Sequence, residues 1–408
     1  MRPAALALAL AAAVACAAPP PSVATQSPSP EEGVLAVTVL LDLSAPRAAL
    51  GTEQRSAMEL WRDQRQQTGA RPEARLTFID LAGSEARLLV ELRRAAVESR
   101  ADAVVIGAPV TYTDLLGRAI DLAAMPVLFT LPLDVADPVT RPGGRWAFAL
   151  APPLGRVAAA AINDATDREA LSPALVLARA ARPGDRDAAA IADEMGRRGR
   201  DPFTEVVLEG ATVPPVVRSA LSVLRSVHCT ATAVACAAVA SEARSLGAPT
   251  LFYLPYVTTP TEVDDRPDLA SRAVWPASRA IIAAEPATAA RRRFLADHAQ
   301  RHGPASSHAA AAFDALTLLA LAAASGGADD PARSRAAMEG ITMPLIATTY
   351  SFSSQDHSGS DPEDLAFVQW TAGAVTYALP AIYGTGIPTP TPSPSLSASP
   401  SPSPGPSP

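Results

Sequence analysis

The sequence contains no lysine, few aromatic residues and no catalytic motif. All 34 positively charged residues among the 408 are arginines, aromatic residues make up 5% of the chain, and the formal net charge is −7. Arginine without lysine is typical of a GC-rich genome. No basic patch with interleaved aromatic residues is present, which argues against nucleic acid as a partner. No Gly-x-Ser-x-Gly, phosphate-binding glycine loop or dinucleotide fingerprint occurs, so neither an enzyme nor a cofactor is predicted.

Long apolar runs are also scarce. Beyond residue 18 the longest candidate is 309–324, which Asp314 interrupts, so we expect a buried helix there and not a membrane span. The first 18 residues differ, because Arg2 precedes a run of alanine and leucine that is shorter than the roughly 20 residues of a permanent span. Such a pattern is typical of an export signal.

The end of this signal resembles the cleavage box of bacterial lipoproteins, in which a cysteine, here Cys16, becomes the lipidated first residue. Leucine is usual where this chain has Ala13, so cleavage after Ala18, which leaves a soluble secreted protein, is the alternative. Both interpretations predict an extracytoplasmic protein. In the first, lipid on Cys16 anchors the chain to the cell membrane.

Two further segments have no apolar pattern. Residues 19–32 are rich in proline and serine and predict a tether, and 386–408 alternate proline with serine or threonine and predict a disordered, extended tail. The chain between them is long enough for two domains.

This central part alternates short apolar runs with helical patterns, which predicts parallel sheets built from strand-helix-strand units. This alternation of strand and helix continues through four units and begins again after residue 153. Two consecutive sets of four units predict two similar lobes. The expected strands are 35–41, 76–80, 103–106, 127–130, 174–178, 203–208, 232–237, 250–254 and 279–283. The expected helices are 52–66, 84–99, 113–123, 186–198, 215–226, 239–246, 287–300 and 307–324.

Two cysteines remain after the signal, Cys229 and Cys236. If 232–237 is a strand, their separation is on the order of 20 Å, which is beyond bridging distance. A turn between them would permit a disulfide in an exported protein. Whether they are bridged stays open here, with two small buried thiols as the favoured interpretation.

Histidine offers one candidate metal pattern. His298 and His302 lie four residues apart on a predicted helix, and His308 is near in sequence, so the rings could face one ion. No glutamate lies between the first two, as a metalloprotease pattern requires, and an ordinary helix explains the segment equally well. No metal site is predicted.

The first predicted strand ends in a short turn, Ser44-Ala45-Pro46. In open parallel sheets, ligands bind beyond the carboxyl ends of the strands, where helix amides are free. Small residues permit a close approach, and the Ser44 hydroxyl can donate a hydrogen bond. We therefore expect this turn to form part of a binding wall.

Five stretches, in order, resemble the substrate-binding proteins of ABC importers for branched-chain amino acids, the leucine-binding type. They are DLSAPRAALGTEQRSAMELW, ADAVVIGAPVTYTD, AMPVLFTLP, SSHAAAAFDALTLLALAAASGG and TTYSFSSQDHSGSDPEDLAFVQWTAGAV. The resemblance covers residues 34–379. It implies an α/β chain with the type I periplasmic-binding-protein fold, in which two doubly wound parallel-sheet lobes are joined by a multi-strand hinge.

The resemblance also implies the lobe limits and some ligand contacts. The first lobe would be 33–150 plus 279–345, and the second 151–278 plus 346–385. Thr111 corresponds to the hydroxyl that takes a ligand carboxylate, with capping of the following helix as the alternative. Leu50 falls where the family lines its side-chain pocket, with core packing as the alternative.

Three departures from the family bear on the ligand. Residues 131–134 replace the small residues and threonine that grip an amino-acid backbone, and 181–186 lack the usual aspartate and Tyr-Gly pair. Tyr256 replaces the acidic residue that pairs with a ligand ammonium, and a phenol carries no charge at neutral pH. Either Asp134 compensates or the ligand is not an ordinary zwitterionic amino acid. Tyr112, Tyr253 and Tyr256 could stack on a ligand or hydrogen-bond to it, with lobe surface as the alternative.

The sequence therefore predicts an exported lipoprotein that captures a small polar solute, such as an amino acid or a related amide or acid, between two lobes. Its partners would be that solute, the membrane through the lipid, and the permease subunits of an ABC importer. The alternative is an extracellular sensor or interaction domain with a degenerate pocket and no transport role.

Overall fold

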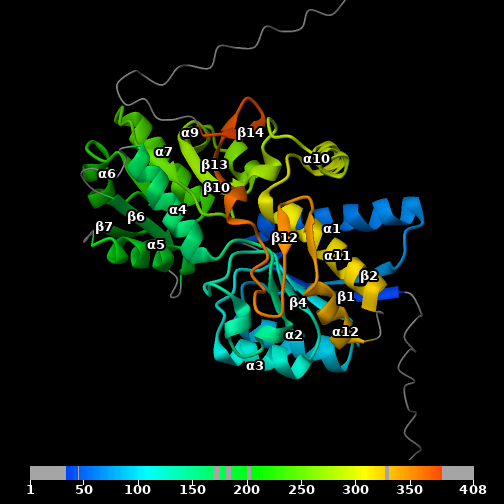
Figure 1. Cartoon of the computed structure of the whole chain (residues 1–408). Coiled ribbons are helices and arrows are strands. Elements are labelled where there is room, and N and C mark those ends of the chain that lie inside the picture. Colours follow the sequence, from blue (N-terminus) through cyan, green and yellow to red (C-terminus); the bar gives the residue numbers. More distant parts are fainter. Residues whose placement is uncertain are drawn as a thin grey trace, which may run out of the picture. The chain divides into compact units, whose positions relative to one another are not determined.

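The computed structural model describes residues 34–44, 46–168, 175–180, 185–199, 204–208, 210–326 and 330–378. The predicted export signal, Cys16, the tether and the C-terminal tail lie outside the described residues. Figure 1 labels helices and strands where there is room for a label.

The first sheet has five parallel strands in the order β2-β1-β3-β4-β5. The strands are β1 (Val34–Leu41), β2 (Glu73–Asp80), β3 (Ala103–Ile106), β4 (Val127–Phe129) and β5 (Ala147–Ala149). The connecting helices are α1 (Ala48–Thr68), α2 (Glu85–Val97) and α3 (Asp114–Ala123). The four strands and three helices predicted for this part of the chain are confirmed.

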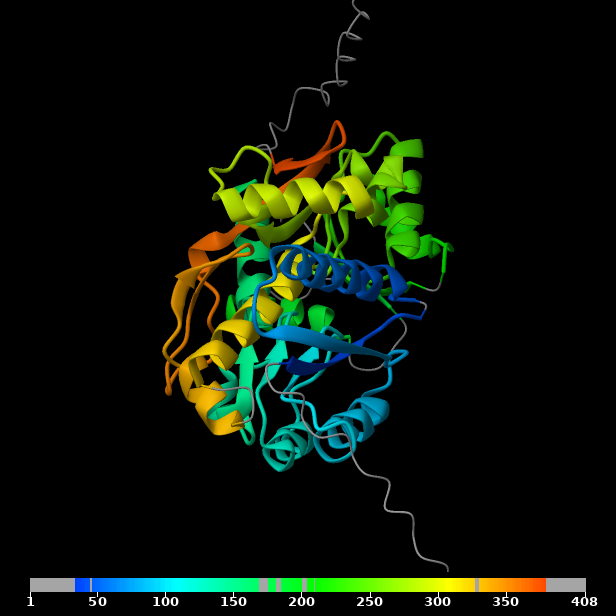
Figure 2. The same cartoon turned by 90° about the vertical axis from the view of Figure 1, so that its right-hand side faces the viewer.

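Both faces of this sheet are covered, as the near-continuous apolar strands require. Val37 and Val39 of β1 pack with Met58 of α1, whereas their neighbour Leu40 packs with Leu92 of α2, because successive side chains point to opposite faces. Figure 2 shows α1 on one side of β1 and β2, and α2 and α3 on the other.

The second sheet has seven strands in the order β14-β13-β10-β9-β8-β6-β7. Its strands are β6 (Leu175–Ala180), β7 (Thr204–Leu208), β8 (Ser226–Cys229), β9 (Leu251–Tyr253), β10 (Ala273–Ser278), β13 (Leu365–Thr371) and β14 (Ala374–Tyr377). Pairing is parallel from β7 to β10 and antiparallel for the last two strands. Its helices are α4 (Leu154–Asp167), α5 (Arg186–Arg197), α6 (Pro215–Leu221), α7 (Ala233–Ser245), α8 (Pro260–Asp264) and α9 (Pro267–Ala270).

Two predicted strands are wrong. Residues 232–237 begin α7, because Thr232 caps this alanine-rich helix by accepting a hydrogen bond from the amide of Ala235. Residues 279–283 hold a short 3-10 helix, η3 (Arg279–Ile281), and the strand is β10 before it. Pro276 hid β10 from sequence analysis. This proline is tolerated because β9 pairs only as far as Val274, so no ladder bond to β9 is lost.

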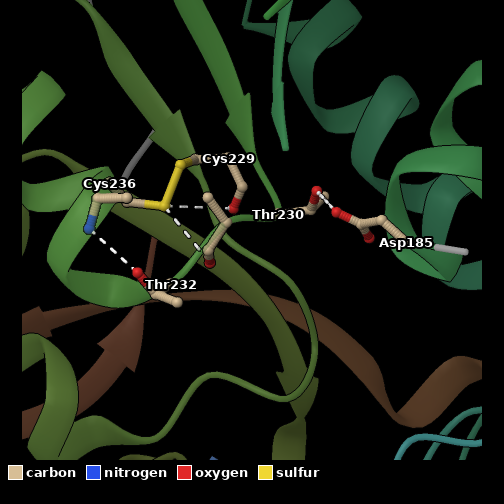
Figure 3. Close-up of a disulfide and its surroundings, with 7 residues drawn as sticks. Asp185, Cys229, Thr230, Thr232 and Cys236 are labelled. Carbon is tan, nitrogen blue, oxygen red and sulfur yellow. Dashed lines mark hydrogen bonds between the residues drawn. A yellow bond between two sulfur atoms is a disulfide. The ribbon is translucent and has the colours of Figure 1, made fainter. Parts of the chain in front are cut away.

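The correction at α7 also changes the cysteine prediction. Cys229 ends β8 and Cys236 lies in the first turns of α7, so their Cα atoms are only 5.9 Å apart and the two sulfurs form a disulfide (Figure 3). The favoured interpretation of two free thiols is therefore wrong. The turn that was needed for pairing is supplied by Thr230 to Thr232.

The chain crosses between the sheets after β5, after β10 and before β13. After β10 it forms α10 (Ala289–His302) and α11 (Ser307–Gly326), which pack on α1, and then α12 (Pro331–Met338). The remaining elements are the hairpin β11 (Thr342–Pro344) and β12 (Thr349–Ser351), and the 3-10 helices η1 (Pro138–Thr140), η2 (Gly144–Trp146) and η4 (Pro362–Asp364).

Helix α11 is the apolar helix that Asp314 interrupts. Its window Ser307–Ser325 is long and apolar enough to span a membrane, but 83% of that window is buried inside the protein. Asp314 is itself buried, and its two carboxylate oxygens accept hydrogen bonds from the amides of Ile346 and Ala347 at 2.9 and 2.6 Å. Burial raises the pKa of Asp314 to about 7. This aspartate fixes the turn between β11 and β12 to the core helix.

The start of α1 lies against the end of β1. A Cβ atom added to Gly51 would overlap the carbonyl oxygen of Asp42, and one added to Gly107 would overlap the side chains of Gln54 and Leu41. Only glycine permits these approaches. They bring the first turn of α1 to the loops that follow β1 and β3.

We expect Gly51→Ala to lower the free energy of unfolding by about 2 kcal/mol, because overpacking costs roughly 1–3 kcal/mol. Gly155→Ala is the matched control, since an added Cβ there meets nothing within 4 Å. This helical replacement should raise stability by about 0.5–1 kcal/mol. Urea unfolding of both variants measures the difference, and equal effects would contradict the close approach.

Candidate ligand-binding site

The loops beyond the first sheet converge at one edge, because parallel strands share the direction of their carboxyl ends. A buried hydrogen-bond network holds them there. The Gln54 amide of α1 donates to the Gly107 carbonyl at 2.7 Å, and the Thr130 hydroxyl donates to the Gln54 amide oxygen at 2.5 Å. The loops after β3 and β4 are thereby tied to α1.

Ser44 lies exposed at this edge, and its hydroxyl donates to the carboxylate of Asp80 at the end of β2. Asp80 also accepts hydrogen bonds from the amides of Leu43 and Ala82, at 2.8 and 2.9 Å. The Ser44 hydroxyl first, and these amides with it, hold the pKa of Asp80 below its usual range. The Ser44 proton is therefore occupied, and its oxygen is left as an acceptor.

In the loop after β3, two roles were predicted for a threonine hydroxyl, ligand contact and capping of the next helix, and Thr111 and Thr113 take one position each. Thr113 caps α3, since its hydroxyl accepts a hydrogen bond from the Leu116 amide at 3.2 Å. Thr111 is partly exposed, and its hydroxyl has no hydrogen-bond partner among the residues that the structure describes. It is thus available to a ligand, and its assignment as a contact stays a prediction.

Asp134 and Tyr112 are joined directly. The exposed Asp134 accepts a hydrogen bond from the Tyr112 amide at 2.8 Å. The Tyr112 side chain is only 2% exposed, and its hydroxyl donates to the Pro142 carbonyl at 3.0 Å. Burial raises the pKa of this phenol. In this conformation the Tyr112 hydroxyl is occupied inside the core of the first sheet.

Leu50 and Tyr256 are buried as well, with exposed fractions of 4% and 3%. Tyr256 packs with Ala151 and Val157 and lines a small recess near the crossing segments. Burial also raises the pKa of its phenol. The structure therefore brings Ser44, Thr111 and Asp134 to an accessible edge of the first sheet, where Leu50 and Tyr112 are buried. Tyr256 is buried elsewhere, in the loop that follows β9 of the second sheet.

Arg186 connects the strand-end loops of the second sheet to those of the first. This residue begins α5, and its guanidinium donates to the Pro132 carbonyl beyond β4 at 2.7 Å. Its Nε and Nη1 atoms are buried and have no hydrogen-bond partner within the described chain. Asp185 caps α5 and accepts a hydrogen bond from the Thr230 hydroxyl at 2.8 Å (Figure 3).

Beside Arg186 a small pocket lies between α4, α5 and the ends of β8 and β9. It is lined by Leu154, Val157, Ala158, Ala161, Asp187, Ile191, His228, Thr230, Tyr253, Leu254, Pro255 and Pro276. His228 is 2% exposed and stacks on Tyr253 with ring centres 4.5 Å apart. Burial lowers the pKa of His228 to about 3, so the imidazole is neutral at physiological pH.

Sequence analysis missed Arg186, Asp187 and His228. The charged triplet 185–187 marks the start of α5, but it does not match the aspartate and Tyr-Gly pair that the family has there. His228 was hidden because Ser226–Cys229 is a strand of four residues with a single aliphatic side chain, too short for an alternation signal.

The three histidines considered for a metal are placed differently. His298 contacts the Gly303 carbonyl through Nδ1 at 2.8 Å, and His308 contacts the Glu53 carboxylate through Nε2 at 3.0 Å. Within the described ranges no group of three or more histidine, cysteine, aspartate or glutamate side chains could hold an ion.

Comparisons with known proteins identify the fold. No protein-family model matches the sequence, and no curated protein matches it significantly. A solved structure of the branched-chain amino acid substrate-binding protein LivJ from Streptococcus pneumoniae, in complex with isoleucine, matches 84% of this chain and 97% of its own, with 15% identity and a TM-score of 0.69. The leucine-binding protein LivK from Thermotoga maritima matches 85% and 98%, with 13% identity and a TM-score of 0.67.

A further match is an ABC-transporter solute-binding protein from Rhodopseudomonas palustris in complex with benzoate, which covers 85% of this chain and 95% of its own, with 15% identity and a TM-score of 0.66. The chain has the type I periplasmic-binding-protein fold. The predicted fold class is confirmed, and identities this low carry no statement about the solute.

In this type I fold His228 makes stability depend on pH. Its pKa is about 3 in the folded protein, and an ordinary histidine has a pKa near 6.5. Below pH 6.5 the unfolded chain therefore binds a proton that the folded chain does not bind, and the free energy of unfolding falls by up to ~1.4 kcal/mol per pH unit. Between pH 7 and pH 4.5 this group should remove about 2.7 kcal/mol.

Denaturant unfolding at the two pH values measures this effect. His228→Phe keeps a ring against Tyr253 and should lose this part of the pH dependence. His302→Gln, at an exposed position, should retain it. The same pH dependence in both variants would show that His228 titrates normally.

Proposed function

We propose that the chain is an exported solute-binding protein, lipid-anchored through Cys16, which closes two lobes on a small solute and delivers it to the permease of an ABC importer. The contact from Arg186 of α5 to the Pro132 carbonyl carries this proposal. It joins loops that follow strand ends of two different sheets, where ligands of parallel sheets bind. We assign 33–150 plus 279–345 to the first lobe and 151–278 plus 346–385 to the second.

Three observations support the proposal. The matched structures are solute-binding receptors, among them complexes with isoleucine and benzoate. The Cys229–Cys236 disulfide suits an oxidising compartment outside the cytoplasm. Ser44, Thr111 and Asp134 present polar atoms at the edge where the solute would lie. Nothing in this arrangement supplies a nucleophile with an activating base, so binding is the function that the geometry supports best.

We expect Thr111→Val to weaken solute binding about tenfold, because a hydrogen bond to a charged group contributes roughly 1.5 kcal/mol or more. Thr113→Val is the matched control. It removes the cap of α3 and should cost about 1 kcal/mol of stability with little change in affinity. Calorimetry with the solute identified by the screen below, together with urea unfolding, separates the two effects. Equal affinity of Thr111→Val and wild type would exclude Thr111 as a contact.

The screen tests the function itself. A bound solute raises the melting temperature by mass action, so thermal shift is measured with isoleucine, leucine, valine, benzoate, short-chain amides and nucleosides. A saturable shift supports solute capture. The second candidate function is an extracellular sensor or interaction domain without transport, which the buried, uncharged Tyr256 favours. No shift with any solute would support that alternative.

A further inference from the structure

The Cys229–Cys236 disulfide closes the loop that joins β8 to α7. Cys229 ends the strand and Cys236 lies in the first turns of the helix, and the two residues are only 0% and 1% exposed. The Cys236 sulfur lies 3.8 Å from the carbonyl oxygen of Ala231, and Thr232 caps the helix. The loop 230–232 is therefore tied at both ends (Figure 3).

Thr230 links this loop to the start of α5. Its hydroxyl donates to the Oδ2 atom of Asp185 at 2.8 Å (Figure 3). The other carboxylate oxygen of Asp185, Oδ1, accepts a hydrogen bond from the amide of Ala188 at 3.2 Å and so caps α5. One carboxylate therefore connects the loop to the first turn of the helix. A shift of the loop would break this connection or move the start of α5.

Arg186 is the first residue of α5 and reaches the loop beyond the other sheet. Its guanidinium donates to the Pro132 carbonyl at 2.7 Å. Hydrogen bonds weaken steeply with distance, so a displacement of about 1 Å would lengthen this one beyond the bonding range. The position of Arg186 follows that of the preceding residue, Asp185. The contact between the two sheets is thus sensitive to where the loop after β8 lies.

We infer that the disulfide is a positioning element for the contact between the two sheets, so that opening the bridge releases Arg186 from Pro132. The effect runs through Thr230 and Asp185. The joining of the two edges then depends on the oxidised state of the bridge. The inference rests on the proposed function in one respect, because it takes the Arg186 contact to be part of lobe closure.

Dithiothreitol is the reductant for the test. One of its thiolates attacks a sulfur of the bridge, forms a mixed disulfide and displaces the other cysteine. Its second thiolate then attacks the mixed disulfide and releases the remaining cysteine. The protein gains two electrons and two protons, and dithiothreitol becomes its cyclic disulfide. Because both cysteines are buried, the double variant Cys229→Ala/Cys236→Ala supplies the opened loop without a need for reductant access.

The measurement is the solvent exchange of the Arg186 Nε–H in the full chain labelled with ¹⁵N-arginine. This nitrogen is buried, and its signal is assigned by its loss in Arg186→Met. We expect exchange about tenfold faster in the double variant and in the reduced wild type, the factor for loss of one hydrogen bond from a charged donor. Unchanged exchange at Arg186 would overturn the inference.

Arg291 of α10 and Arg335 of α12 are internal controls, because their Nε atoms are also buried. Their exchange should stay at the wild-type rate when the bridge is opened. If all three arginines exchanged faster by the same factor, the disulfide would only stabilise the fold as a whole, and the positioning role would be wrong.

Variants of the loop test the path with the bridge intact. Thr230→Val should accelerate Arg186 exchange by the same factor, and Thr230→Ser, which keeps the hydroxyl, should not. Thr232→Val is the matched control, since it removes the cap of α7 and leaves the bond to Asp185 in place. Thr230→Val added to the double cysteine variant should have no further effect, because both changes act through one path. Additive effects would contradict that path.

Failure of this inference is distinguishable from failure of solute capture. If the solute screen finds a ligand and Arg186 exchange does not respond to the disulfide, the proposed function stands and the positioning role is wrong. If Arg186 responds and no solute shifts the melting temperature, the positioning role stands and solute capture is wrong.

Discussion

The close approach of α1 to the ends of β1 and β3 is the constraint on which the binding edge depends. Gly51 and Gly107 allow the backbones and Gln54 to come together, and Gln54 then bonds to Gly107 and Thr130. A buried polar network of this kind stabilises one arrangement, because any displacement leaves several groups unsatisfied at once. The loops that carry Thr111 and Asp134 are thereby held in place before a ligand arrives.

The two edges differ in how far their polar groups are satisfied. On the first, Ser44 and Asp134 already have protein partners. On the second, Arg186 keeps two buried nitrogens and His228 one buried nitrogen without partners in the described chain. Unsatisfied buried groups cost free energy and are rare in native proteins. If the proposed function holds, a solute would gain most from pairing at the second edge, whereas the residues that the family resemblance implies lie mainly on the first.

Sequence reasoning succeeded where local signals and tertiary structure agree. The strands of the first sheet are buried on both faces and read as aliphatic runs, so their positions were predictable. It failed at 232–237, where alanine and valine fit a strand or a helix, and the Thr232 cap decides for the helix. It also failed at β10, whose Pro276 suggests a break. The sequence predicted only that the site lies at the strand ends. Which side chains are buried there, such as Tyr112 and Tyr256, and which nitrogens lack a hydrogen bond, such as Nε2 of His228, depend on contacts from distant segments.

The Arg186 contact has a consequence for how closure would work. Arg186 donates to the Pro132 carbonyl, so part of the free energy that joins the two edges comes from a contact within the protein itself. A solute shifts the equilibrium only by its differential affinity for the closed form. The Arg186 contact contributes free energy to the closed form whether or not a solute is bound. It therefore raises the population of the closed form, and the apparent affinity for a solute rises with that population. A solute that makes few polar contacts across the proposed cleft can then still hold the lobes closed.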